Sequence, residues 1–222
     1  MVPKIAYHLF KLPPVGKLIG LVFEYGSFLL PVKRIVDNDR VIAFLHPWPH
    51  FDEHIIIVPK KTVPTFPSLL CDDNIQYLID ILSAARDLIS KRPWDRYVLA
   101  VNGGPRQEIK QVHFHLYKGR ASSENFTDKS AGELLYSGEG VRIFRHPKPS
   151  WEIHVVIWLP QLVTLEQPSR EQVSTIKEPL SYFEKLDRTF NLAERGYTVF
   201  VHGQDLSDKY GPIFHVVSGR QL

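Results

Sequence analysis

Residues 44–49 read FLHPWP and are followed by His54, and residues 144–149 read FRHPKP and are followed by His154. The two stretches lie 100 residues apart, and the same shift aligns further positions up to the end of the chain. Self-similarity at one fixed period is the sequence signature of a repeated folding unit. The sequence therefore predicts two copies of one unit, arranged in tandem.

The repeat divides the chain into four parts. They are an N-terminal helical extension at residues 1–30, a first copy at residues 31–120, a polar linker at residues 121–134 and a second copy at residues 135–222. The linker is rich in Ser, Asn, Asp and Gly, which favour loops. The apolar stretch 19–30 in the extension contains Glu24, and it is shorter than the ~18 to 20 residues that span a bilayer. We therefore expect no transmembrane segment.

Each copy shows the same order of elements: strand, turn, strand, helix, strand, strand. In the first copy we expect strands at residues 40–45, 53–59, 97–102 and 111–118 and a helix at residues 72–91. Their counterparts are strands at residues 141–145, 153–159, 197–202 and 211–218 and a helix at residues 170–192. Short β-branched runs bounded by turn residues favour strands, and apolar residues at 3.6-residue spacing favour a helix. The expected fold is α+β, with two antiparallel sheets that join into one as an intramolecular pseudo-dimer.

The composition limits the classes of function. The chain has 222 residues, of which 44% are hydrophobic and 23% are charged, as in ordinary globular proteins. The formal net charge of +3 is too small to require a nucleic acid or an anionic membrane as partner. Cys71 is the only cysteine, so the chain cannot form an internal disulfide, which fits a reducing compartment. We expect a cytoplasmic protein with no specific nucleic-acid partner.

A polar stripe occupies the last expected strand of the first copy, where residues 111–117 read QVHFHLY. Alternation along a strand sends Gln111, His113, His115 and Tyr117 to one face and three apolar residues to the other. Two imidazoles two residues apart stand close together, so one can react while its neighbour donates a hydrogen bond. The stripe predicts nucleophilic or acid–base chemistry, although a wet sheet face shows the same alternation.

Zinc binding is the other chemistry that a His-x-His pattern on a strand indicates, because neutral imidazoles bind this metal. His54 would supply the third ligand that such a site needs. A single cysteine excludes a site with two thiolates. We expect a site without metal and without a cofactor.

The chain resembles the histidine triad superfamily of nucleotide hydrolases and transferases. The resemblance covers residues 31–120 and rests on residues 37–44 (DNDRVIAF), residues 54–61 (HIIIVPKK) and residues 107–120. The signature of the superfamily is three alternating histidines followed by a glycine, and Gln111, His113 and His115 stand at the three places. The resemblance implies that the central residue, His113, attacks the α-phosphorus of a nucleotide to give a nucleotidyl-histidine, with no metal.

The resemblance also implies a set of site residues. The catalytic set is His113, His115, His54 and Gln111, and the substrate-binding set is Asn102, Gly103, Gln107, His46, Phe44 and Trp48. A neutral imidazole is a competent nucleophile at pH 7 because its reference pKa is ~6.5, provided that a backbone carbonyl holds its second nitrogen. His115 would donate to a phosphate oxygen or to the leaving group.

Three positions depart from the pattern of the superfamily. Gln111 replaces the first histidine and cannot hold a proton. His46 stands where relatives have the acidic or amide residue that binds the ribose hydroxyls. In the second copy Ile213 takes the place of His113, so that copy has no nucleophile. We expect one working site in a monomer with an internal pseudo-twofold axis.

These features predict a nucleotide hydrolase that cleaves a phosphoanhydride or phosphoramidate bond, with a nucleotide or nucleotide conjugate as its partner. A nucleotidyltransferase or phosphorylase of the uridylyltransferase-like kind is the alternative, because a tandem pair of copies with one catalytic site also resembles those enzymes. A catalytically silent nucleotide-binding protein is a further alternative, which the departures at Gln111 and His46 favour.

Overall fold

The computed structural model describes most of both copies. It describes residue 24 and residues 32–71, 73–94, 96–119, 132–138, 141–158, 182–202 and 213–222. The extension expected at residues 1–30, apart from Glu24, lies outside the described residues, as does most of the expected linker. In the described part of the chain, the helices are too short or too polar to cross a membrane.

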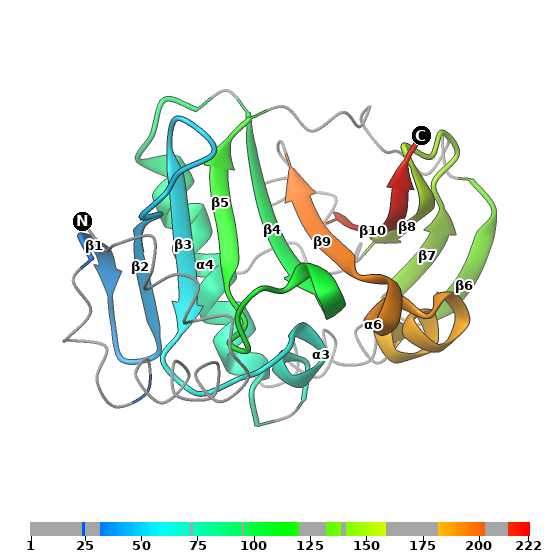
Figure 1. Ribbon diagram of the computed structural model, residues 1–222, viewed down its shortest axis with the longest axis horizontal. Helices are drawn as coiled ribbons and strands as arrows, with labels where there is room; N and C mark the ends of the chain where they lie inside the picture. Colours follow the sequence, from blue (N-terminus) through cyan, green and yellow to red (C-terminus); the bar gives the residue numbers. More distant parts are fainter. Residues whose placement is uncertain are drawn as a thin grey trace.

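Within the described residues, ten strands form one antiparallel sheet (Figure 1). They are β1 (Arg34–Asp37), β2 (Val41–Leu45), β3 (His54–Pro59), β4 (Tyr97–Gly103), β5 (Phe114–Lys118), β6 (Leu134–Gly138), β7 (Val141–Arg145), β8 (Trp151–Trp158), β9 (Tyr197–His202) and β10 (Ile213–Gln221). Their order across the sheet is β1-β2-β3-β5-β4-β9-β10-β8-β7-β6. The order is symmetric, because β6 to β10 take the places of β1 to β5 in reverse. The fold is α+β with a large antiparallel sheet, as predicted.

The two central strands join the first five strands to the last five. β9 pairs with β4 along its whole length, from Val98 opposite His202 to Gly103 opposite Tyr197. Ala100 and Phe200, which correspond under the shift of 100 residues, lie opposite each other at the middle of this pairing. The sheet is therefore continuous through the junction of β4 with β9.

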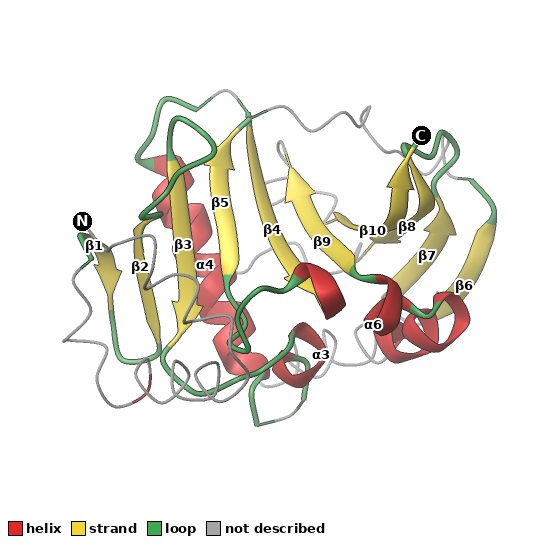
Figure 2. Cartoon of the chain, viewed as in Figure 1, coloured by secondary structure: helices red, strands yellow, loops and turns green. Residues whose placement is uncertain are grey.

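The main helix covers one face of the first five strands. α4 (Ile75–Ser90) packs behind β2 and β3 (Figure 2). Its buried residues recur at helical spacing and include Ile75, Leu78, Ile79, Leu82, Ala85 and Leu88. An apolar stripe of this kind drives a helix onto a sheet. The shorter helical elements are α3 (Phe66–Leu69), the 3-10 turn η2 (Gly104–Arg106) and α6 (Leu192–Arg195), and residues 182–190 are also helical.

The two faces of the sheet differ in chemistry because side chains alternate along each strand. Leu99 and Leu116 belong to the apolar core that α4 covers. His115 lies opposite Ala100 in the pairing of β4 with β5, and both face the other side of the sheet. The histidines of the polar stripe therefore lie on the face opposite α4.

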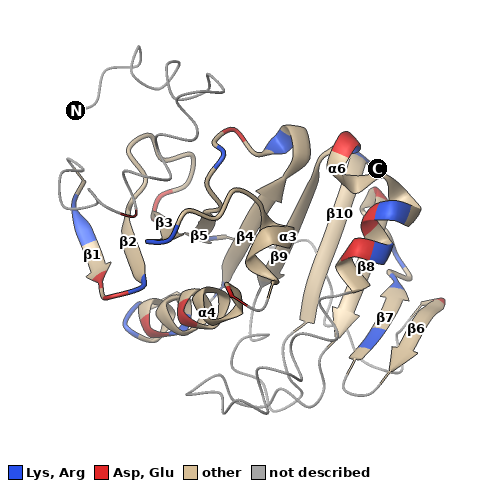
Figure 3. Ribbon diagram, turned by 90° about the horizontal axis from the view of Figure 1, so that it is seen from below, with Lys and Arg blue, Asp and Glu red and all other residues tan. Residues whose placement is uncertain are grey.

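The exposed side of α4 carries charges of both signs. Seen from below, acidic and basic residues are interspersed along this helix (Figure 3). Asp80, Arg86 and Asp87 are among them. Interspersed charges of this kind make a solvated surface rather than a field of one sign, which is what attracts a polyanion.

Structure and sequence-based expectation differ at the sheet edges and at some element ends. The edge strands β1 and β6 were not expected, because each is short and its pairing contains a register shift. β5 begins at Phe114 rather than at residue 111. The helix expected at residues 72–91 begins at Ile75. Only residues 182–192 of the helix expected at residues 170–192 are described, and the helix there ends at residue 190.

Candidate active site

His54 and His115 are brought together by the pairing of β3 with β5. The register places His54 opposite Tyr117 and Ile56 opposite His115. Nε2 of His54 lies 2.9 Å from Nδ1 of His115, a hydrogen bond between two imidazoles. The His54 ring is buried, and the described residues offer no hydrogen-bond partner to its Nδ1. The two rings thus form a pair in which one donates and the other accepts.

His113 immediately precedes β5 and lies beside this pair. The centre of its ring is 4.9 Å from that of His115, with the rings edge to face. Nδ1 of His113 lies 2.8 Å from the backbone carbonyl oxygen of Gln111. A carbonyl oxygen can only accept, so in the neutral ring Nδ1 carries the proton and Nε2 keeps its lone pair. Burial lowers the pKa of His113 below its ordinary value, which favours this neutral form.

The side chain of Gln111 lies apart from the polar stripe. It is 1% exposed, and its amide nitrogen donates to the carbonyl oxygens of Pro59 at 3.2 Å and Lys61 at 3.0 Å. Its amide oxygen accepts from the backbone N–H of Val63 at 3.1 Å. The expected alternation fails at this first position because the chain joins the sheet only at Phe114. Gln111 therefore braces the backbone behind His113.

His46 lies flat against His54. The two ring centres are 4.2 Å apart and the ring planes differ by 8°. The backbone N–H of Trp48 donates to Nδ1 of His46 at 3.0 Å, so the proton of the neutral ring sits on Nε2. Burial, together with the neighbouring histidines, lowers the pKa of His46 and of His54 to about 4 and that of His115 to about 2. All three rings are neutral at pH 7 and offer N–H donors without positive charge.

Comparison with known proteins places this cluster in a family. Residues 29–122 match the family model of the HIT domain. An uncharacterized HIT-like protein of Methanocaldococcus jannaschii is 30% identical over 89 residues, which are 39% of this chain and 68% of that protein. The chain belongs to the histidine triad (HIT) family. The matched residues contain the four clustered histidines and Gln111.

Two solved structures resemble this HIT protein over most of its length. An ADP-glucose phosphorylase from Arabidopsis thaliana with bound ADP-glucose aligns with 89% of this chain and 79% of its own, at 10% identity and a TM-score of 0.60. A galt-like protein from the same plant aligns with 90% of this chain and 82% of its own, at 10% identity and a TM-score of 0.58. At these identities the likeness concerns the fold.

Asn102 and Gly103 lie at the end of β4, where the first copy meets β9. Oδ1 of Asn102 accepts a hydrogen bond from the hydroxyl of Thr198 at 2.8 Å. A Cβ atom on Gly103 would collide with the ring of Tyr197. Gly103 is therefore required by the packing of β9 against β4, whatever its relation to a ligand.

The remaining binding residues expected from the sequence are Gln107, Phe44 and Trp48. The amide nitrogen of Gln107 donates to the carbonyl oxygens of Pro64 at 2.6 Å and Ile109 at 2.8 Å, so this side chain braces a loop. Phe44 is buried in an apolar cluster on the histidine face of β2 and β3. Trp48 is half-buried, and its backbone N–H orients His46. The structure brings the histidines together directly, and Trp48 contacts them through its backbone N–H.

Two aromatic residues that the sequence analysis gave no role pack against His54. Phe51 and Tyr117 stack with their centres 3.8 Å apart, and both meet His54 edge to face, at 5.5 Å and 5.8 Å. Burial raises the pKa of Tyr117. The sequence signal for Tyr117 was its place in the stripe, whereas Phe51 lies in a turn and gave none. Their stack shields one side of His54 from water.

The second copy of this HIT protein repeats the histidine pair and its stacked neighbour. Nε2 of His154 lies 3.0 Å from Nδ1 of His215. His146 stacks on His154 with a centre-to-centre distance of 4.1 Å and an angle of 9°. The backbone N–H of Lys148 donates to Nδ1 of His146 at 3.1 Å, as Trp48 does in the first copy. The fold thus builds the same frame twice.

The two frames differ in what surrounds them. Ile213 opens β10, at the place that His113 takes before β5. The ring of Phe200 lies parallel to that of His215, with centres 4.9 Å apart and planes 8° apart. The corresponding residue of the first copy is Ala100, which has no ring to cover His115. The second frame therefore lacks a nucleophile at this position and is covered by a phenyl ring.

By spacing alone, each frame would suit a metal ion. The candidate ligand atoms of His46, His54 and His115 lie within 4.8 Å of one another, as do those of the three histidines in the second frame. A histidine that binds a metal usually donates from its other nitrogen. Nδ1 of His46 instead accepts from the N–H of Trp48, and the second frame repeats this bond. The described residues fit a hydrogen-bonding ring better than a metal ligand at this position.

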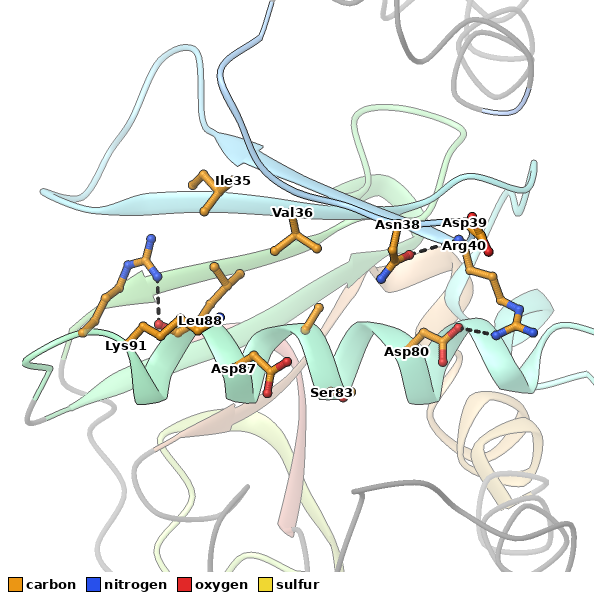
Figure 4. Close-up of a pocket in the computed structure, with 12 residues that line it drawn as sticks. Ile35, Val36, Asn38, Asp39, Arg40, Asp80, Ser83, Asp87, Leu88 and Lys91 are labelled. Carbon is orange, nitrogen blue, oxygen red and sulfur yellow. Dashed lines mark hydrogen bonds and ion pairs between the residues drawn. The ribbon is translucent and has the colours of Figure 1, made fainter.

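A cavity in the described part of the chain lies away from the histidines. It has a volume of about 840 Å³ and lies between the β1–β2 hairpin and α4 (Figure 4). Its charged lining residues are Asp39, Arg40, Asp80, Asp87, Lys91 and Arg92. Arg40 and Asp80 form an ion pair at 3.1 Å. This cavity is separate from the histidine cluster.

Proposed function

We propose that this protein hydrolyses a phosphoanhydride or phosphoramidate bond at the α-phosphate of a nucleotide or nucleotide conjugate, through a nucleotidyl-histidine intermediate. The observation that supports this proposal is the bond from Nδ1 of His113 to the carbonyl oxygen of Gln111, 2.8 Å long. It leaves Nε2 of His113 unprotonated in the neutral ring, which is the state that a nucleophile needs. Membership of the HIT family is in keeping with this chemistry.

In the first step, the lone pair of Nε2 of His113 forms a bond to the α-phosphorus, and the bond from phosphorus to the leaving group breaks. The leaving group keeps the electron pair, accepts a hydrogen bond from Nε2–H of His115, and takes its proton from solvent. For His115 to carry its own proton on Nε2, its Nδ1 must accept from Nε2–H of His54, across the 2.9 Å hydrogen bond. In the second step, water attacks phosphorus, the bond to His113 breaks with its electron pair returning to Nε2, and the proton from the water passes to solvent.

The covalent intermediate places a positive charge on His113, because both ring nitrogens are then substituted. The carbonyl oxygen of Gln111 accepts from the charged ring, and hydrogen bonds to charged groups contribute about 1.5 to 3 kcal/mol. His46, His54 and His115 add no opposing charge at pH 7, because burial lowers the pKa of each. The site is thus suited to a nucleophile that becomes cationic.

The proposal extends to the two copies. We assign the working site to residues 31–120 and a supporting role to residues 135–222, in a monomer with an internal pseudo-twofold axis. The symmetric strand order supports the assignment of two copies. Ile213 and the phenyl ring of Phe200 on His215 support a second copy without turnover.

Release of AMP from adenosine 5′-phosphoramidate and from diadenosine tetraphosphate tests the proposal. Wild-type protein is expected to turn over at least one of them, and His113→Ala is expected to lower turnover by on the order of a thousandfold or more. His50→Ala, at an exposed histidine near the cluster, is the matched control and should leave turnover within about twofold of the wild type. An α-labelled substrate should give an acid-labile, base-stable label on the protein. Wild-type protein inert on both substrates contradicts the proposal.

Transfer of the nucleotidyl group to an acceptor other than water is the second candidate. Most of the chain, 89% of it, shares its fold with an ADP-glucose phosphorylase, which favours this reading. With ADP-glucose and orthophosphate, attack of phosphate on a nucleotidyl-histidine gives ADP, whereas attack of water gives AMP. Faster release of ADP than of AMP would favour transfer. Binding of AMP without turnover of any of these substrates would favour a silent nucleotide-binding protein.

A further inference from the structure

We infer that Thr198, a residue of the second copy, is a positioning residue of the site in the first copy, and that it acts by fixing the side-chain amide of Asn102. This inference rests on the proposed function, since it assigns Asn102 to the substrate. It gives the second copy a role in the reaction that does not depend on its own histidines.

The sheet places Asn102 between Thr198 and His113. Asn102 lies directly opposite Thr198 in the pairing of β4 with β9. In the pairing of β4 with β5, the last pair is Val101 opposite Phe114, and Asn102 and His113 are the next residues beyond this pair. Residues opposite each other in a sheet have neighbouring side chains on the same face. Asn102 is therefore a direct neighbour of Thr198, at the end of β4 that is next to the start of β5, where His113 lies.

A chain of hydrogen bonds fixes which way the amide of Asn102 points. Nη1 of Arg106 lies 3.3 Å from the hydroxyl oxygen of Thr198, which lies 2.8 Å from Oδ1 of Asn102. A guanidinium can only donate, so the hydroxyl accepts from Arg106 and keeps its own proton for a second partner. An amide turned the other way would present N–H to the hydroxyl and leave that proton without an acceptor. Oδ1 consequently faces Thr198, and the Nδ2 donors of Asn102 are left for a ligand.

Arg106 is itself anchored to the second copy. Its Nη2 donates to the carbonyl oxygen of Gly219 at 2.7 Å, and its guanidinium lies over the ring of Trp151 at 4.9 Å. Because the guanidinium is engaged by β8, β9 and β10, its role is to hold Thr198 in place. Asn102, Thr198 and Arg106 are thus joined by hydrogen bonds across the junction of β4 with β9.

The amide of Asn102 would then offer its Nδ2–H groups to an oxygen of the α-phosphate beside His113. A preorganised donor binds the ligand without first losing the freedom to turn. The simpler reading is that Thr198 only joins two strands. That reading predicts an effect on folding but none that depends on Asn102.

A double-mutant cycle on AMP affinity separates the two readings. Thr198→Val keeps the shape of the side chain and removes the hydroxyl, and we expect it to weaken AMP binding about five- to tenfold, the scale of one lost hydrogen bond. Thr198→Ser should restore binding to within about twofold. In the Asn102→Ala background, the same Thr198→Val change should alter affinity by less than about twofold. Equal factors in both backgrounds, or no loss in the single variant, would overturn the inference.

A second measurement keeps the inference testable if the proposed function fails. The side-chain amide signals of Asn102 in ¹H–¹⁵N spectra of the free protein report its hydrogen bonding directly. We expect Thr198→Val to shift these signals, whereas Val98→Ala, at the corresponding position of β4, leaves them unchanged. Wild-type protein that binds no AMP but shows this shift would count against the proposed function alone. Unchanged Asn102 signals in folded Thr198→Val protein would overturn the inference.

Discussion

Gln111→Leu is expected to lower the free energy of unfolding by about 3 kcal/mol. The substitution removes three hydrogen bonds that bind residues 59–63 to the buried amide of Gln111. Each such bond contributes about 1 kcal/mol net, and a buried donor left without a partner costs about 1 to 3 kcal/mol. The N–H of Val63 would be such a donor. Burial of the apolar leucine side chain offsets part of this loss, so the net change in the free energy of unfolding stays near that of three hydrogen bonds.

Urea unfolding followed by circular dichroism at pH 7 measures this difference. Gln76→Leu is the matched control, because Gln76 makes one hydrogen bond, to Asp80 on the surface of α4, and should cost less than about 0.5 kcal/mol. Gln111→Glu tests the polarity of the bonds, since a carboxylate accepts from Val63 but repels two carbonyl oxygens. It should destabilise at least as much as leucine at pH 7, with the gap to wild type narrowing as acid protonates it. A Gln111→Leu protein within 1 kcal/mol of wild type would refute the reasoning.

Three further outcomes are expected. Stability should fall as the pH drops from 6.5 to about 4, because the pKa of His54 is 6.5 in the unfolded chain and about 4 in the folded one, so the unfolded state takes up the proton first. With solvent screening, we expect this ring to contribute roughly 1 to 2 kcal/mol. Acid unfolding curves in which His54→Gln shows the same dependence of stability on pH as the wild type would contradict it. Gly103→Ala should lower the free energy of unfolding by about 2 to 3 kcal/mol, because its Cβ would meet the Tyr197 ring. Gly119→Ala, whose Cβ would have its nearest contact at 3.3 Å, should lower it by less than about 1 kcal/mol, with both variants measured by thermal unfolding. Turnover should stay within about twofold after dialysis against a chelator, since Nδ1 of His46 accepts from backbone N–H rather than donating; loss of turnover that zinc restores would count against this tautomer.

The strands of the central sheet were predictable because their alternation is local. β2, β3, β4, β7 and β9 begin and end within one or two residues of the expected positions. The edge strands β1 and β6 were missed, since four or five residues with a register shift show no clear alternation. The local sequence pattern therefore predicted the inner strands, but it did not predict the strands that pair at the two edges of the sheet.

The histidine cluster was predictable only in part. The stripe placed His115 on the face that it occupies, but it also placed Gln111 there, where the chain has not yet joined the sheet. The roles of Arg106 and Thr198 depend on contacts across the junction of the two copies. Such contacts join residues about a hundred positions apart, so no local spacing indicates them. The repeat at a shift of 100 residues predicts that the two copies join into one sheet, but it does not predict which side chains meet at the junction.

The comparison of the two copies narrows what makes the first one chemically distinct. Both copies contain an imidazole pair at 2.9 to 3.0 Å and a stacked histidine whose Nδ1 accepts from a backbone N–H. Because the second copy has the same three histidines without a nucleophile at the place of His113, this arrangement of histidines is not by itself evidence of catalysis. The copies differ at His113 and Ile213, and at Ala100 and Phe200, where a phenyl ring stacks on His215 but Ala100 has no ring to stack on His115. The proposed reactivity must therefore depend on His113 and on the absence of a ring at Ala100 beside His115, while the shared frame orients imidazoles in both copies.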